Sequence, residues 1–162
     1  RVGRRRRRDP VAPQGQLSEA MNNATHHDPV AVQDDIISSF SLFPEWLDRY
    51  QYLIDLGRKL TPLAEEEKTD DKLLAGCQSQ VWLYLEGDAD QVIIRANSDA
   101  AIVSGLIALL ISVYSGCSAK QIAGTEPYFI REIGLSDHLS PTRANGLHAM
   151  LNAIKGYAQG LL

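Results

Sequence analysis

The sequence predicts an α+β domain in which helices pack on one small antiparallel sheet. Three observations predict this class. Apolar residues recur at helical spacing near both ends of the chain, a short aromatic and β-branched stretch in the middle is typical of a hairpin, and an almost wholly apolar helix follows that stretch. The 162 residues have the length of one domain, which at this size buries roughly 68–70% of its unfolded surface without disulfides.

Two helices are expected before the sheet. The first begins at Asp28 and Pro29, because Asp can cap a helix and Pro fits its first position. The second begins at Pro44, and we expect Gly57 to end it in a left-handed conformation. The apolar stripe of the second helix repeats every 3.6 residues and consists of Trp46, Tyr50, Leu53 and Ile54.

The middle of the chain predicts β structure. The acidic segment 61–72 is expected to be a solvated linker. The segments Gln80–Leu85 and Val92–Arg95 then have the residue types of two strands, and the turn residues Gly87–Asp90 between them predict an antiparallel hairpin. An independent sheet would need a third strand, which the sequence does not place.

The remaining elements are helical. Ser98 is expected to cap a helix that runs to about Tyr114 and is buried, because apolar residues cover nearly all its faces. Two short turns follow at Ser118–Gly124 and Pro127–Gly134, and Ser140-Pro141 starts the last helix. The apolar stripe of that helix consists of Leu147, Leu151, Ile154 and Ala158.

Charge divides the chain into two parts. Residues 1–28 are Arg-rich and show no periodicity, so we expect a disordered leader or tag there; a transit-peptide remnant or a polybasic nucleic-acid arm are the alternatives. Residues 29–162 form the predicted domain. Residues 21–162 carry ten Lys and Arg against eighteen Asp and Glu. This acidic body excludes binding to nucleic acid or anionic membrane surfaces and favours a partner with a basic patch.

Cysteine usage indicates a reducing compartment. Cys77 and Cys117 are too few for a disulfide framework, and neither stands at metal-ligand spacing from the other or from a histidine. We therefore expect free thiols in the cytoplasm, or in an organelle matrix if the leader is a transit peptide. The longest apolar run, Ala100–Val113, is shorter than the roughly 18–20 residues of a membrane span.

Cys77 is the candidate reactive group. It lies between Gly76 and Gln78 just before the predicted hairpin, where a loop could present a thiol to a partner. Gly76 permits backbone conformations that would aim the neighbouring side chain outward. The residues alone favour a buried and inert cysteine over a functional one, because most free cysteines are of that kind.

Three ordered blocks then resemble a known family. The segment Gly-Cys-Gln-Ser-Gln-Val-Trp-Leu (76–83) resembles the signature of SufE-like proteins. The segments at 98–108 and 138–147 resemble the start of that family's central helix and the entry to its closing helix, and the resemblance covers roughly residues 30–160. It implies a SufE/NifU-like α+β fold with a small antiparallel sheet.

The resemblance implies a sulfur-acceptor protein. Cys77 would take a persulfide sulfur from a cysteine desulfurase of the SufS/CsdA type, stimulate that enzyme, and pass the sulfur to iron–sulfur scaffold proteins. The chain, as a monomer or homodimer, would then be a transfer partner rather than a stand-alone enzyme. Pyridoxal phosphate would belong to the desulfurase, and we expect no cofactor or metal on this chain.

Arg143 is a second candidate. A cation in the first turn of a helix opposes the helix macrodipole, which marks the position as functional or tightly paired. The family block Ser-Pro-Thr-Arg (140–143) implies a supporting role in function. A structural ion pair with a nearby carboxylate is the alternative.

Two other functions remain open. One is a cysteine hydrolase that uses Cys77 with His138 or His148 and an Asn such as Asn145. The other is a regulatory binding module that needs no thiol. We expect Cys117 to be a structural thiol, because the C-terminal end of the buried helix disfavours a thiolate.

Overall fold

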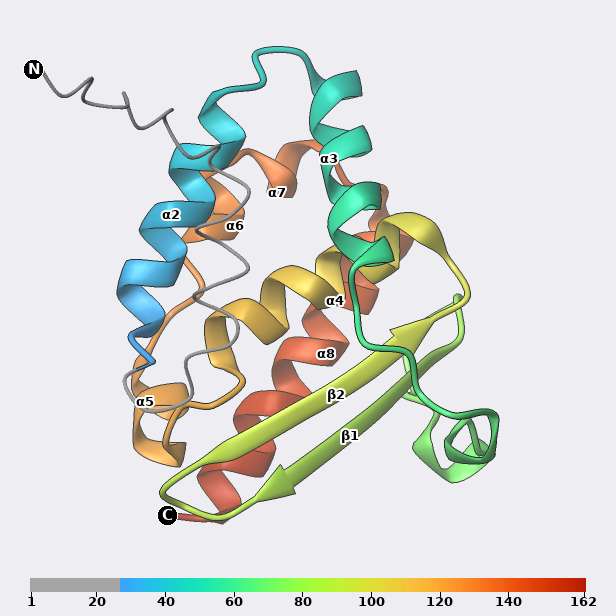
Figure 1. Ribbon diagram of the computed structural model, residues 1–162, viewed down its shortest axis with the longest axis vertical. Helices are drawn as coiled ribbons and strands as arrows, with labels where there is room; N and C mark the ends of the chain where they lie inside the picture. Colours follow the sequence, from blue (N-terminus) through green and yellow to red (C-terminus); the bar gives the residue numbers. More distant parts are fainter. Residues whose placement is uncertain (1–26) are drawn as a thin grey trace, which may run out of the picture.

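The computed structural model describes residues 27–162, so the expected leader lies outside the described residues except for its last two positions (Figure 1). The order of elements is the expected one. Two helices precede a two-stranded antiparallel hairpin, a buried helix follows, and short helices lead to a long final helix. The predicted α+β class is confirmed.

The first two helices both pack against the central helix α4, Ala101–Tyr114 (Figure 1). Helix α2 is Pro29–Ser41, and the Asp28 carboxylate accepts hydrogen bonds from the backbone N–H groups at its start, as predicted. Helix α3 is Trp46–Arg58 and begins two residues after the expected Pro44, with Glu45 at its N-cap. The buried residues of the two helices are Pro29, Val32, Gln33, Ile36, Phe40, Leu53 and Gly57.

Gly57 does not end α3, so that prediction is wrong. It lies inside the helix, and its φ is not positive. Its lack of a side chain serves the crossing of α3 with α4 instead. A Cβ on Gly57 would lie 2.7 Å from the backbone nitrogen of Gly105, and a Cβ on Gly105 would lie 2.2 Å from the carbonyl oxygen of Leu53. The two glycines therefore let the helix backbones touch.

Helix α4, Ala101–Tyr114, is the buried central helix, since ten of its 14 residues are buried. Its N-cap is Ala100, not the predicted Ser98. Ser98 instead ends the preceding strand, and its hydroxyl accepts a hydrogen bond from the Ala100 N–H at 3.2 Å. The strand thus runs so close to the helix that the expected cap falls within the strand.

The hairpin consists of β1, Val81–Gly87, and β2, Val92–Ser98, paired antiparallel from Val81 opposite Ser98 to Gly87 opposite Val92. Within residues 27–162 the sheet has no third strand. Its β2 residues alternate, and the buried ones, on the face toward α4, are Val92, Ile94 and Ala96. This packing supplies the apolar support that a lone hairpin lacks.

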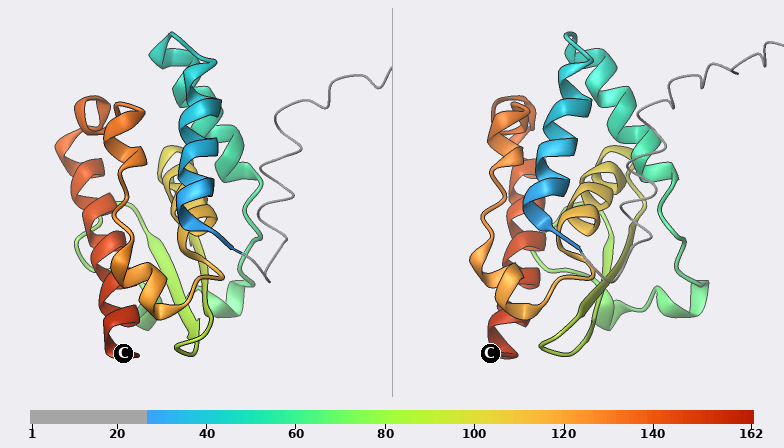
Figure 2. Two further views of the ribbon diagram at one scale, coloured as in Figure 1. Left: turned by 90° about the vertical axis from the view of Figure 1, so that its left-hand side faces the viewer. Right: turned by 60° about the vertical axis from the view of Figure 1, so that its left-hand side comes forward.

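Short helices carry the chain from α4 to the final helix. They are α5 (Ala119–Gly124), α6 (Phe129–Glu132) and α7 (Leu135–His138). Helix α8, Pro141–Gly160, begins as predicted, with the Ser140 hydroxyl accepting from the backbone N–H of Arg143. Figure 2 shows α8 and the short helices gathered on one side of the molecule.

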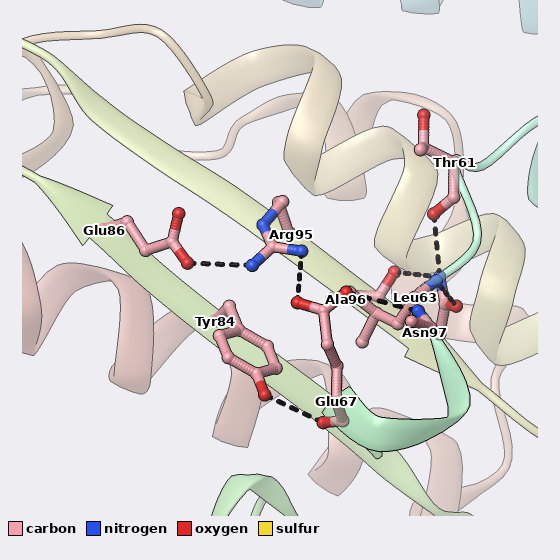
Figure 3. A network of polar contacts seen from close by, with 9 residues as sticks. Thr61, Leu63, Glu67, Tyr84, Glu86, Arg95, Ala96 and Asn97 are labelled. Atoms are coloured by element: carbon pink, nitrogen blue, oxygen red, sulfur yellow. Dashed lines mark hydrogen bonds and ion pairs between the residues drawn. The ribbon is translucent and has the colours of Figure 1, made fainter.

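Segment 61–73, here called the strap, crosses the outer face of the hairpin rather than extending into solvent (Figure 3). It contains two single-turn 3-10 helices, Glu65–Glu67 and Asp70–Lys72. At its start, the Asn97 side chain of β2 accepts a hydrogen bond from the Leu63 N–H at 2.6 Å and donates one to the Thr61 carbonyl oxygen. The segment is largely exposed, as predicted, but it is also tied to the sheet.

Arg95 holds the middle of the strap. Its guanidinium contacts the carboxylate of Glu67 in the strap at 2.7 Å and that of Glu86 in β1 at 2.9 Å (Figure 3). The Tyr84 hydroxyl donates to the Glu67 carbonyl oxygen at 2.9 Å. The hydrogen bond from Arg95 lowers the pKa of the Glu67 carboxyl, so the pair stays ionised at neutral pH. The strap leads directly into the loop that carries Cys77.

Candidate functional site

The Cys77 loop, residues 74–80, connects the strap to β1. Both of its ends are fixed: the Leu74 N–H donates to the Val81 carbonyl oxygen at 2.9 Å, and the Gln80 N–H donates to the Asp99 carboxylate at 3.0 Å. Between these anchors Gly76 has a φ of 89°, a conformation that only glycine adopts easily. The loop is thus a short arch with fixed ends and a glycine beside the thiol.

The Cys77 thiol points back onto the protein. Its Sγ lies 3.8 Å from the carbonyl oxygen of Gly146 in α8. Beside it is a cavity of about 20 Å³, here called the thiol recess, which has room for about one water-sized atom. The apolar side chains that line the recess come from α4 and α8 and are Val103, Leu106, Leu147 and Met150.

The two thiols have different surroundings. Cys77 is half-buried, and burial raises its pKa, so the thiolate is disfavoured while the loop rests on α8. Cys117 is 0% exposed, its Sγ donates to the Val113 carbonyl oxygen at 3.4 Å, and burial raises its pKa to about 12. Cys117 is therefore inert at neutral pH, in keeping with the structural role expected for it.

Arg143 lies at the edge of the thiol recess, in the first turn of α8. Its side chain is exposed. Its guanidinium makes no hydrogen bond or ion pair with any residue from 27 to 162, so the expected alternative of a structural ion pair is not seen there. Burial is the cause of the raised Cys77 pKa, so Arg143 has no visible effect on the thiol while the loop rests on α8.

The candidate residues of a cysteine hydrolase are not brought together. The His138 ring stacks on Trp46 with centroids 3.7 Å apart, and its Nδ1 lies 3.0 Å from the Gly134 carbonyl oxygen. His148 lines a separate, open hollow of about 690 Å³. The residues that line the thiol recess include neither Asn145 nor any histidine of the described part of the chain.

Residues 27–162 contain no cluster of three or more His, Cys, Asp or Glu side chains able to hold a metal ion. Their helices are all too short or too polar to cross a membrane.

Two features of the site could not be predicted from the sequence. Gly146 and the α4 residues of the recess lie far from Cys77 along the chain, and only the folded structure brings them to it. The available signal was Gly146 itself, because a glycine in the interior of a helix costs about 1 kcal/mol relative to Ala and calls for a packing reason.

Comparisons with known proteins agree with this structure. The family model described as "SufE: Fe-S metabolism associated domain" matches residues 34–158. A protein of Rhizobium meliloti, named an uncharacterized SufE-like protein, is 42% identical over 134 residues, covering 80% of this chain and 96% of the relative. A protein of Rhizobium etli with the same description is 42% identical over 135 residues, covering 80% and 91%.

A solved structure shows the same fold. The solution structure of a hypothetical protein from Thermus thermophilus matches with a TM-score of 0.65 at 21% identity, covering 80% of this chain and 95% of that one. The family match spans most of the chain, including the Cys77 loop and the start of α8. The chain therefore belongs to the SufE family of Fe–S metabolism associated domains.

Proposed function

We propose that this protein accepts a sulfur atom on Cys77 from the persulfide of a cysteine desulfurase and passes it on for iron–sulfur cluster assembly. One observation carries the proposal: the thiol lies on a short loop over an apolar recess that Arg143 also lines, and the Arg143 guanidinium has no ion-pair partner among residues 27–162. The family's association with Fe–S metabolism supplies the biological setting.

The chemistry needs only a thiolate and a donor persulfide. The Cys77 thiolate attacks the outer sulfur of the donor's R–S–SH group. A new S–S bond forms to Cys77 while the donor's S–S bond breaks, and the donor cysteine leaves as a thiolate. The transferred sulfur keeps its oxidation state, and its hydrogen stays with it or exchanges with water. No external oxidant or reductant takes part.

The loop controls when the thiol reacts. On α8 the raised pKa of Cys77 keeps the sulfur protonated and slow to oxidise. Docking of the desulfurase lifts the loop outward, which restores an ordinary thiol pKa; about 3% of such a thiol is ionised at pH 7. Arg143, exposed at the recess edge, then raises the thiolate fraction by favouring the anion.

The partner supplies the remaining parts. Pyridoxal phosphate and the step that removes sulfur from cysteine belong to the desulfurase, whose turnover rises because its persulfide is removed. The acidic body of this chain favours a basic docking patch on that enzyme. The step requires reduced thiols, so we place it in the cytoplasm or an organelle matrix.

The test is loading by a desulfurase. The protein is incubated with a cysteine desulfurase, pyridoxal phosphate and cysteine, and its intact mass is measured. We expect the mass of one added sulfur atom on the parent protein and on Cys117→Ser, and none on Cys77→Ser. Equal loading of Cys77→Ser contradicts the proposal. Stimulation of the desulfurase that survives Cys77→Ser, without loading of the parent, favours a purely regulatory module instead.

A further inference from the structure

Gly146 occupies a position that helix formation disfavours. It lies in the sixth position of the 20-residue helix α8 and is buried, although glycine is the poorest residue for a helix interior apart from proline. A Cβ built on Gly146 meets one atom beyond its own helix within 4 Å, the Sγ of Cys77 at 3.5 Å. The space that a side chain at position 146 would occupy therefore faces the thiol.

The other glycines of α8 differ in this respect. A Cβ on Gly156 or Gly160 would have nothing within 4 Å. Neither position thus has a steric reason to lack a side chain. Gly146 is set apart from them by its contact with the thiol recess, which it helps to line.

We propose that Gly146 is a positioning residue for the persulfide: by lacking a side chain, it keeps the thiol recess open for the outer sulfur atom on Cys77. The inference rests on the proposed function for the identity of that atom. The bare thiol does not need the space, because 3.5 Å is an ordinary contact between a methyl group and sulfur. The persulfide does need it.

The sizes agree with this role. An S–S bond places the outer sulfur about 2 Å beyond Sγ. The recess of about 20 Å³ has room for about one more atom, which matches the single outer sulfur of a persulfide. A methyl group at position 146 enters the same space, so Gly146→Ala accepts the thiol but turns the outer sulfur of the persulfide out toward solvent.

The experiment measures how well the outer sulfur is sheltered. Inorganic tetrasulfide loads the free protein, because the Cys77 thiolate takes one sulfur from the tetrasulfide dianion and releases the trisulfide dianion. Cyanide then removes that sulfur as thiocyanate and regenerates the thiolate. The rate of thiocyanate release from equally loaded samples reports the exposure of the outer sulfur. Cys77→Ser is the blank.

We expect thiocyanate release from Gly146→Ala to be about fivefold faster or more, the ratio that corresponds to the low end of overpacking costs. Alkylation of the unloaded thiol should change less than about twofold, because the methyl contact with Sγ is ordinary van der Waals contact. Gly156→Ala is the matched control, with both rates as in the parent protein. Both variants should melt about 2–4 °C higher, since alanine favours the helix.

Equal thiocyanate release from Gly146→Ala and the parent overturns the inference. So does an equal rise in thiol alkylation, because the methyl would then displace the whole loop rather than the outer sulfur alone. These outcomes are independent of the proposed function. If a desulfurase fails to load Cys77 while chemically loaded Gly146→Ala still loses its sulfur faster, the proposed donor is wrong and the role of Gly146 stands.

Discussion

Gly76→Ala should shift the Cys77 loop from its closed toward an open conformation. Gly76 has a φ of 89°, and a residue with a side chain in such a conformation is strained by about 1–2 kcal/mol. The added Cβ would lie 3.5 Å from the Cβ of Ala149, which is an ordinary contact. The cost of the substitution is therefore backbone strain in the closed loop, not a clash.

This strain should appear as thiol reactivity. The loop is fixed at Leu74 and Gln80, so it can open without unfolding the domain. A strain of about 1–2 kcal/mol that is relieved on opening raises the ratio of open to closed loops by about 5–30-fold. Opening also removes the burial that raises the Cys77 pKa. Alkylation by iodoacetamide near neutral pH should rise by a similar factor. The melting temperature should also fall by a few degrees, because the closed loop of the folded state carries the strain.

Gly116→Ala is the matched control. Gly116 also has a φ of 89°, and its Cβ would meet only the Cβ of His27, at 4.0 Å, among residues 27–162. Its N–H is bonded to the Val92 carbonyl oxygen, so its strain falls on the domain as a whole. The melting temperature should fall by several degrees with Cys77 alkylation unchanged. The reasoning is refuted if Gly76→Ala leaves alkylation unchanged but lowers the melting temperature as Gly116→Ala does.

Three further outcomes are expected. Arg143→Ala should slow loading of sulfur from a desulfurase by about tenfold or more, because one hydrogen bond to a charged group contributes about that much. The substitution should change the free energy of unfolding by no more than about 0.5 kcal/mol. A collapse in melting temperature would show that Arg143 is structural. The free energy of unfolding should fall by about 1 kcal/mol from pH 9 to 10 in urea titrations. The Cys117 thiol has a pKa of about 12 in the folded protein and therefore stays protonated, whereas in the unfolded chain it loses its proton near pH 9.0. An equal slope in Cys117→Ala would contradict that assignment. Gly105→Ala should cost about 3 kcal/mol or more in the same titrations, since its Cβ would lie 2.2 Å from the Leu53 carbonyl oxygen; a stability near that of Gly156→Ala would refute the close helix crossing.

Features set by neighbouring residues could be predicted from the sequence. Asp28 and Ser140 start helices because their side chains accept hydrogen bonds from N–H groups within the next three residues. The alternation of β2 and the apolar faces of α4 are also local patterns. These signals place the elements in order and predict the α+β class.

Features that depend on distant contacts could not be predicted. Gly57 has the spacing of a helix stop, yet it packs against Gly105, 48 positions later in the sequence. The strap is acidic and resembles a solvated linker, but Arg95 and Asn97 bind it to the hairpin. The thiol of Cys77 could be singled out in the sequence, whereas its seat against Gly146 exists only in the fold.

The most direct test follows one sulfur atom through a single transfer. A desulfurase is loaded with cysteine, freed of excess substrate and mixed with the protein, and peptide masses are followed in time on both chains. The account predicts that sulfur leaves the desulfurase persulfide as it appears on the peptide that contains Cys77. Sulfur that stays on the desulfurase, or appears on the peptide with Cys117 instead, would contradict it.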